Sequence, residues 1–141
     1  MSIRFFSDGV SFEFEGKRNI SHWLKLIIAK EGKKTGHLLF IFVSDKIILD
    51  LNRKYLKHNE YTDIITFDNS KGNTISGEMY ISIDTVRQNA KDYQVDFRNE
   101  LLRVMVHGTL HLCGYKDKTI DEQLEMRALE DKYLDELRIE N

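Results

Sequence analysis

The sequence of 141 residues contains no proline and a single cysteine. With only Cys113 present, no disulfide can form within the chain, so a reducing compartment is expected. The lack of proline, of repeats and of low-complexity linkers leaves nothing that marks a second domain. A chain of this length suits one domain with a single core. We therefore predict one domain that spans residues 1–141.

Long apolar runs and a strong net charge are also missing. No uncharged apolar run reaches the roughly 20 residues that a membrane-spanning helix needs. The first residues do not have the layout of a signal peptide. These absences predict a cytoplasmic protein without membrane contact. The formal net charge is −2, so no overall basic field indicates nucleic-acid binding.

The hydrophobic pattern predicts a mixture of strands and helices. Strands are expected at 3–6, 10–14, 37–43, 62–68 and 75–83, with the first two as a hairpin or two edge strands. Helices are expected at about 19–30, 46–55, 84–93 and 97–113, and from 119 or 121 onward. The apolar stripe of the last helix consists of Leu124, Met126, Leu129, Tyr133, Leu134 and Leu137. This order predicts an α+β fold, a single mixed β-sheet with helices packed on it.

Two histidines carry the most specific chemical signal. His107 and His111 are four residues apart, so on a helix their imidazoles share one face. Gly114 is suited to end this helix in a left-handed conformation, and a chain that turns there brings Asp117 back over both rings. Two imidazoles and one carboxylate then form a ligand set for Zn²⁺ or a similar ion, with a fourth position for water. The alternative is that such histidines are hydrogen-bonded core residues.

The spacing of these residues follows the metzincin pattern H-E-x-x-H-x-x-G-x-x-H with two changes. Gly108 stands where metalloproteases carry the glutamate that acts as general base, so the peptidase mechanism lacks a part. Asp117 stands in the third ligand position and keeps a donor that suits Zn²⁺, while Mn²⁺ or Mg²⁺ is less excluded. We therefore predict a metzincin-like metal-binding helix.

Four sequence blocks share the order and spacing of a known family. Residues 107–115 read His-Gly-Thr-Leu-His-Leu-Cys-Gly-Tyr, and residues 51–55 read Leu-Asn-Arg-Lys-Tyr. Residues 62–67 read Thr-Asp-Ile-Ile-Thr-Phe, and residues 77–82 read Gly-Glu-Met-Tyr-Ile-Ser. These blocks resemble the H-G-x-L-H-L-x-G-Y, L-N-x-x-Y, T-D-V-L-S-F and G-D-I-x-I-S motifs of the YbeY family of metal-dependent endoribonucleases. The resemblance covers the chain from about residue 51 to residue 126.

This resemblance implies a zinc-dependent hydrolase that cleaves single-stranded RNA. In the family, the activity serves maturation of the 3′ end of small-subunit (16S) rRNA and ribosome quality control. The implied partners are single-stranded rRNA and the ribosome or its small subunit, with no membrane and no small-molecule cofactor. The implied site holds one Zn²⁺ per chain on His107, His111 and Asp117, and both histidines belong to the catalytic centre. The near-neutral net charge predicts weak unaided affinity for RNA, which favours a protein partner as the source of specificity.

The sequence departs from the family pattern at two positions. Asp117 takes the place of the third histidine ligand, and Leu56 takes the place of an arginine that follows the L-N-x-x-Y tyrosine. Lys54, Lys57 and His58 are candidate replacements for that arginine. We predict Lys57 and His58 as catalytic residues that stabilise the developing charge. The alternative is that both are solvated loop residues.

The remaining candidates have supporting roles. Asp63 or Thr66 is expected to orient the substrate or a ligand histidine, unless both are only structural. Cys113 is expected to be a packed thiol and not a metal ligand. The sequence leaves two alternative functions open, a metallopeptidase and a ribosome-assembly module whose metal is structural.

Overall fold

The computed structural model describes residues 2–56 and 62–140, and within them the chain forms one four-stranded sheet. The strand order is β1 (Ser2–Ser7), β2 (Lys34–Val43), β4 (Thr74–Ser82) and β3 (Ile64–Asp68). The β1–β2 and β2–β4 pairs are parallel, and the β3–β4 pair is antiparallel. The sheet is therefore mixed, which confirms the predicted α+β class.

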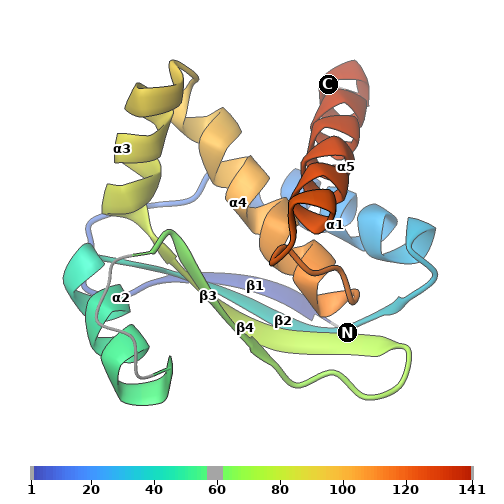
Figure 1. The fold of residues 1–141 in the computed structure, drawn as a ribbon, viewed down its shortest axis with the longest axis horizontal. Coiled ribbons are helices and arrows are strands. Elements are labelled where there is room, and N and C mark those ends of the chain that lie inside the picture. Colours follow the sequence, from blue (N-terminus) through green and yellow to red (C-terminus); the bar gives the residue numbers. More distant parts are fainter. Residues whose placement is uncertain (1, 57–61, 141) are drawn as a thin grey trace.

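Helices cover both faces of this sheet (Figure 1). The helical elements are α1 (Lys17–Lys30), α2 (Asp45–Leu51), the π-helix η1 (Asn52–Leu56), α3 (Ile83–Tyr93), α4 (Phe97–Leu112) and α5 (Ile120–Glu140). Helices α1, α3, α4 and α5 contribute to the larger core cluster on one face. Helix α2 contributes Ile48 to a smaller cluster on the other face.

The C-terminal part of β2, residues 38–43, is a continuous run of apolar side chains. Leu38, Phe40 and Phe42 belong to the larger cluster, whereas Ile41 and Val43 belong to the smaller one. Successive side chains of a strand point to opposite faces, so a strand covered on both faces has no polar side to alternate with. The strand expected at 37–43 is confirmed, and it lies inside the sheet between β1 and β4.

Helix α4 lies at the centre of the helical layer, in contact with α1, α3, α5 and the strands β3 and β4. It packs tightly against the sheet at Gly108. A Cβ atom at this position would lie 2.7 Å from Ile64 Cδ1 and 2.8 Å from Met79 Sδ. Because the glycine carries no side chain, the C-terminal half of α4, with both histidines, can sit directly on the β3–β4 hairpin.

Two local predictions are wrong. Residues 10–14 form no strand, because β1 pairs in parallel with β2. The Phe12 ring instead packs edge-on against Phe42, and Phe14 stacks on Phe5. Their alternation with glutamates arises from rings that enter the core. Leu124 is 63% exposed and does not belong to the buried stripe of α5.

The length and hydropathy of the helices bear on the predicted lack of membrane contact. Among the helices that the structure describes, none combines the length and the apolar character needed to cross a bilayer.

Candidate metal centre

The last turns of α4 and the segment that follows bring the three predicted ligands together. His107 and His111 lie on one face of α4, with ring centroids 4.7 Å apart. Helix α4 ends in backbone bonds from Gly114 N to His111 O and from Tyr115 N to Leu110 O. Gly114 has a φ of 110°, a conformation that glycine adopts at little cost. The chain then reverses and places Asp117 against both imidazoles.

The distances between these ligand atoms suit a zinc ion. Asp117 Oδ2 lies 3.2 Å from His107 Nε2 and 3.4 Å from His111 Nε2. All three ligand atoms lie within 4.8 Å of one another. In a tetrahedral zinc site with bonds of about 2.0–2.1 Å, neighbouring ligand atoms are about 3.3–3.4 Å apart. The donor set and its spacing therefore fit a divalent ion held by three protein ligands.

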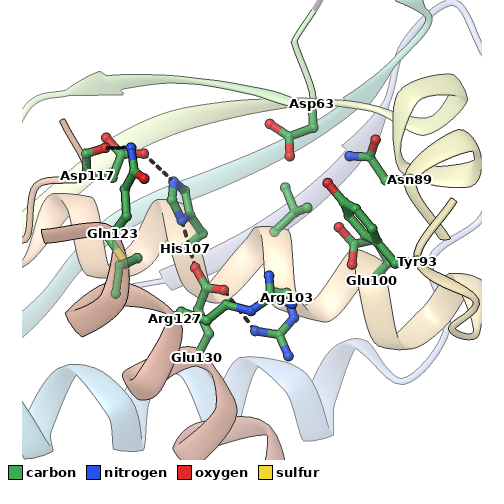
Figure 2. Close-up of a pocket in the computed structure, with 12 residues that line it drawn as sticks. Asp63, Asn89, Tyr93, Glu100, Arg103, His107, Asp117, Gln123, Arg127 and Glu130 are labelled. Carbon is green, nitrogen blue, oxygen red and sulfur yellow. Dashed lines mark hydrogen bonds and ion pairs between the residues drawn. The ribbon is translucent and has the colours of Figure 1, made fainter. Parts of the chain in front are cut away.

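The ring of His107 is oriented from behind by a buried ion pair (Figure 2). Its Nδ1 lies 2.8 Å from Glu130 Oε2, and the other carboxylate oxygen of Glu130 accepts a bond of 2.9 Å from Arg103 Nη1. Arg103 Nη2 also donates to Asp131 Oδ1 at 2.6 Å. Glu130 is only 5% exposed. A carboxylate at Nδ1 favours the tautomer with its proton there, which leaves the Nε2 lone pair facing Asp117.

The ring of His111 is held by the backbone instead. Its Nδ1 lies 2.8 Å from the carbonyl oxygen of Tyr115. A carbonyl can only accept, so Nδ1 is the donor and Nε2 is the free ligand atom. The Tyr115 hydroxyl donates to Glu31 Oε1 at 2.6 Å, and the Tyr133 hydroxyl donates to the other oxygen of Glu31. Glu31 thus ties the ligand loop to α1 and α5.

The electrostatics of the site follow from burial and from these partners. Burial lowers the pKa of His107, but the bond to Glu130 and the charges of Glu130 and Asp117 outweigh it, so the pKa is raised overall. Burial also raises the pKa of Asp63, against the opposing charge of His107. Burial likewise raises the pKa of Glu100. Buried carboxyl groups therefore lie close to the triad, and a cation bound there would stabilise their ionised forms.

Two cavities open on either side of the triad, and both are lined by His107, Asp117 and Asp63. The strand-side pocket, of about 540 Å³, is also lined by His111, Leu56, Thr62, Thr66, Asp68 and Lys118. The helix-side pocket, of about 310 Å³, is also lined by Asn89, Tyr93, Glu100, Arg103, Val104 and Arg127. The ligands thus form a wall shared by two open spaces, which leaves room for a substrate on either side.

Most predicted residues are found near this centre. Asp63 and Thr66 line the strand-side pocket, as does Leu56, the position at which the family pattern has arginine. Lys54 Nζ lies 5.3 Å from the centroid of the Tyr55 ring. Lys57 and His58 lie outside the described residues, so their predicted catalytic role stays a prediction. Cys113 packs against the larger core cluster and burial raises its pKa to about 11, so it is a packed thiol.

The sequence alone did not identify three residues of the site. Glu130 and Arg103 orient His107, and Lys118 brings a cation to the strand-side pocket. Glu130 did leave a signal, since it lies four residues after Met126 and three before Tyr133, both buried on α5. An acid inside an apolar helical stripe needs a buried partner. The identity of that partner depends on the packing of α5 against α4.

The position of Gly108 bears on the metallopeptidase alternative. The glutamate of a metalloprotease follows the first histidine and acts as the general base. Here that position faces Ile64 and Met79 of the sheet, with no space for a side chain. The chain lacks the base, and its fold leaves no room to accommodate one there.

Comparison with known proteins adds an independent result. The sequence model of the family described as "Endoribonuclease YbeY" matches residues 3–138. A relative of that name from Parabacteroides distasonis is 46% identical over 134 residues, which cover 92% of this chain and 94% of the relative. The relative of the same name from Flavobacterium psychrophilum is 44% identical, with 92% of each chain covered.

The fold has a solved counterpart as well. The solution structure of a protein from Thermotoga maritima matches with a TM-score of 0.66 and 31% sequence identity. The match covers 99% of this chain and 91% of that protein. The likeness therefore extends over the whole sheet and the helical layer.

Proposed function

This chain belongs to the YbeY family of endoribonucleases, and from that premise we propose that it is a zinc-dependent hydrolase of single-stranded RNA. Its proposed task is maturation of the 3′ end of 16S rRNA, together with ribosome quality control, in the cytoplasm. The observation that supports the metal dependence most strongly is the triad of His107, His111 and Asp117. Its ligand atoms have the spacing of a zinc site, and both imidazoles are held at Nδ1.

The chemistry of the proposed site divides between the ion and the protein. When bound, the ion lowers the pKa of water and polarises a phosphoryl oxygen. Glu130 and the Tyr115 carbonyl hold the rings so that no reorientation is needed during the reaction. Asp63 and Thr66 line the cavity that receives the substrate, where they position it. The protein thus contributes mainly fixed geometry.

A cation is needed beside the phosphate, because negative charge develops on it during hydrolysis. Leu56 cannot supply that charge. We assign the role to Lys57 and His58, as predicted, with Lys118 as a further cation at the rim of the strand-side pocket. Lys118 directly follows the ligand Asp117, so its backbone is fixed by the same loop.

The ribosome or its small subunit is the proposed partner. A net charge of −2 provides little long-range attraction for a polyanion. A ribosomal surface that binds the protein would raise the local concentration of its RNA target. This proposal predicts faster cleavage of rRNA within the subunit than of the same RNA free in solution.

The test is cleavage of an end-labelled, single-stranded fragment of the 16S rRNA 3′ region and of the small subunit that contains it. The wild type is compared with His111→Ala and with His22→Ala, an exposed histidine of α1 outside the site. We expect cleavage by the wild type and by His22→Ala, and none by His111→Ala. Equal cleavage by all three, or none on either substrate, would contradict the proposed function.

A further inference from the structure

The helix-side pocket has features that binding of a metal ion does not require. Its volume of about 310 Å³ lies at the lower end of the range for small-molecule sites. One end is formed by His107 and Asp117, and the other by residues of α3 and α4 (Figure 2). Any molecule in this pocket therefore lies directly beside the proposed cleavage centre.

An aromatic side chain stands at the far end of this pocket. Tyr93, near the end of α3, is 58% exposed. Its ring lies beside Asn89 and Glu100 in Figure 2. An exposed aromatic ring beside an RNA-cleaving centre offers a flat face on which a base can stack. Val104, buried on α4, adds an apolar contact to the same pocket.

The polar groups around Tyr93 suit a base better than a phosphate. The side-chain amide of Asn89 has no hydrogen-bond partner among the residues that the structure describes, so its donor and acceptor are both available. The carboxyl groups of Glu100, which is buried, and Asp63 face the same cavity. Carboxylates repel phosphate but accept hydrogen bonds from amino groups.

Arg103, which lines the pocket, does not change the preference for a base over a phosphate. Both terminal nitrogens of Arg103 already donate to carboxylates. Nη1 donates to Glu130 at 2.9 Å, and Nη2 donates to Asp131 at 2.6 Å. Arg127, on the exposed side of α5, is the cation that remains at the rim. The pocket is therefore lined by the carboxyl groups of Asp63 and Glu100, by Arg103 with its charge paired, and by Arg127 as the remaining cation.

We propose that the helix-side pocket is a nucleobase subsite that stacks one base of the RNA on Tyr93 and favours bases with an exocyclic amino group. This inference rests on the proposed RNA substrate. Adenine, cytosine and guanine bring an exocyclic amino donor to Asn89, Glu100 and Asp63, whereas uracil has none. Asparagine in particular matches the paired donor and acceptor of adenine. The subsite would hold the nucleotide next to the cleaved bond.

The test uses ligands that cannot be cleaved, so that binding is separated from catalysis. The full-length protein is titrated with AMP, CMP, UMP and ribose 5-phosphate, and the backbone amide signals of Asn89, Tyr93 and Val104 are followed by NMR. We expect AMP and CMP to shift these signals and UMP to bind roughly 5-fold or more weakly, as expected when a buried polar group is left unpaired. Ribose 5-phosphate should leave them unchanged.

Variants of Tyr93 then isolate the stacking contact. Tyr93→Phe keeps the ring and should keep AMP binding. Tyr93→Leu keeps apolar volume without a flat face and should weaken AMP binding by roughly 5- to 150-fold. The matched control is Phe6→Leu, which replaces an exposed aromatic ring on β1 that does not line the helix-side pocket. This variant should bind AMP as the wild type does.

The possible outcomes separate the two proposals. Equal affinities for AMP and UMP, or shifts that survive Tyr93→Leu, would overturn the nucleobase subsite. RNA cleavage by the same preparations is measured in parallel. Cleavage without base binding would overturn the subsite and keep the nuclease, whereas base binding without cleavage would overturn the proposed function and keep the subsite.

Discussion

At the residue scale, the two ligand imidazoles are held by acceptors of different strength. His107 contacts a buried carboxylate, whereas His111 contacts a backbone carbonyl. The carboxylate makes the His107 ring a stronger donor to a cation, because it stabilises positive charge on the imidazole. Arg103, which pairs with the other oxygen of Glu130, holds that carboxylate in place behind the ring.

Replacement of Glu130 by glutamine should therefore weaken metal binding without loss of volume. We expect the zinc dissociation constant to rise about 10- to 100-fold, the usual effect of losing such a supporting partner. The measurement is a competition titration against a chromophoric chelator. Asp131→Asn is the matched control, because Asp131 also pairs with Arg103 but does not contact His107. Equal dissociation constants for wild type and Glu130→Gln would contradict this role.

Gly108 offers a second test at the residue scale. Gly108→Glu supplies the glutamate that follows the first histidine in the metzincin pattern. The new side chain would collide with Ile64 and Met79 and bury a charge. We expect the free energy of unfolding to fall by at least about 3 kcal/mol, with no gain of peptidase activity. Urea denaturation and a casein assay measure the two effects. A stable Gly108→Glu variant that hydrolyses casein would revive the metallopeptidase interpretation.

At the element scale, the contacts of Glu31 connect three helices around the ligand loop. Glu31 follows α1, Tyr115 follows α4, and Tyr133 belongs to α5. Both phenols donate to the Glu31 carboxylate. The hydrogen bond to Glu31 raises the pKa of Tyr115 to about 12, and burial with the bond to Glu31 raises that of Tyr133 as well. The helical layer is thus joined by phenols that must stay neutral.

This linkage predicts a loss of stability in alkali. Because the phenol pKa values are higher in the folded protein than the unfolded value of about 10, their contribution is complete below pH 10 and is lost as the pH rises through the folded values. Urea denaturation between pH 7 and 11.5 should show this decline. Tyr133→Phe should be less stable at pH 7 but decline less steeply above pH 10. Parallel declines for the two proteins would contradict the linkage.

The helices and strands also show where local sequence suffices. The ligands His107, His111 and Asp117 lie within eleven consecutive positions, so one helix and one turn determine their arrangement. The β3–β4 hairpin was likewise predictable from adjacent segments. In contrast, Glu130 approaches His107 from a different helix. Nothing local specifies that α5 packs against α4 in this register.

At the scale of the whole molecule, the errors of the sequence interpretation have the same cause. Residues 10–14 alternate like a strand, but β1 pairs with β2, more than thirty positions away, and that pairing leaves no partner for a hairpin. Coverage of β2 on both faces was predictable, because its residues 38–43 include no polar side chain. Strand order and the two pockets depend on long-range packing, which no short pattern contains.

The positions of the two pockets indicate where the substrate would lie. The triad lies between two cavities, one with Lys118 at its lining and one with Tyr93. A single strand of RNA that crosses the shared wall would present its phosphodiester to the triad and a neighbouring base to the helix-side pocket. We therefore expect this one centre to carry the cleavage of RNA.

The most direct test is stoichiometric reactivation. The protein is stripped of metal with a chelator, and the rate of cleavage of the 16S rRNA 3′ fragment, free or within the small subunit, is measured as Zn²⁺ is added in fractions of one equivalent. The rate should rise linearly and stop rising at one Zn²⁺ per chain, and His111→Ala should not respond. A rate that is independent of added metal, or that rises equally in His111→Ala, would show that the triad does not carry the reaction.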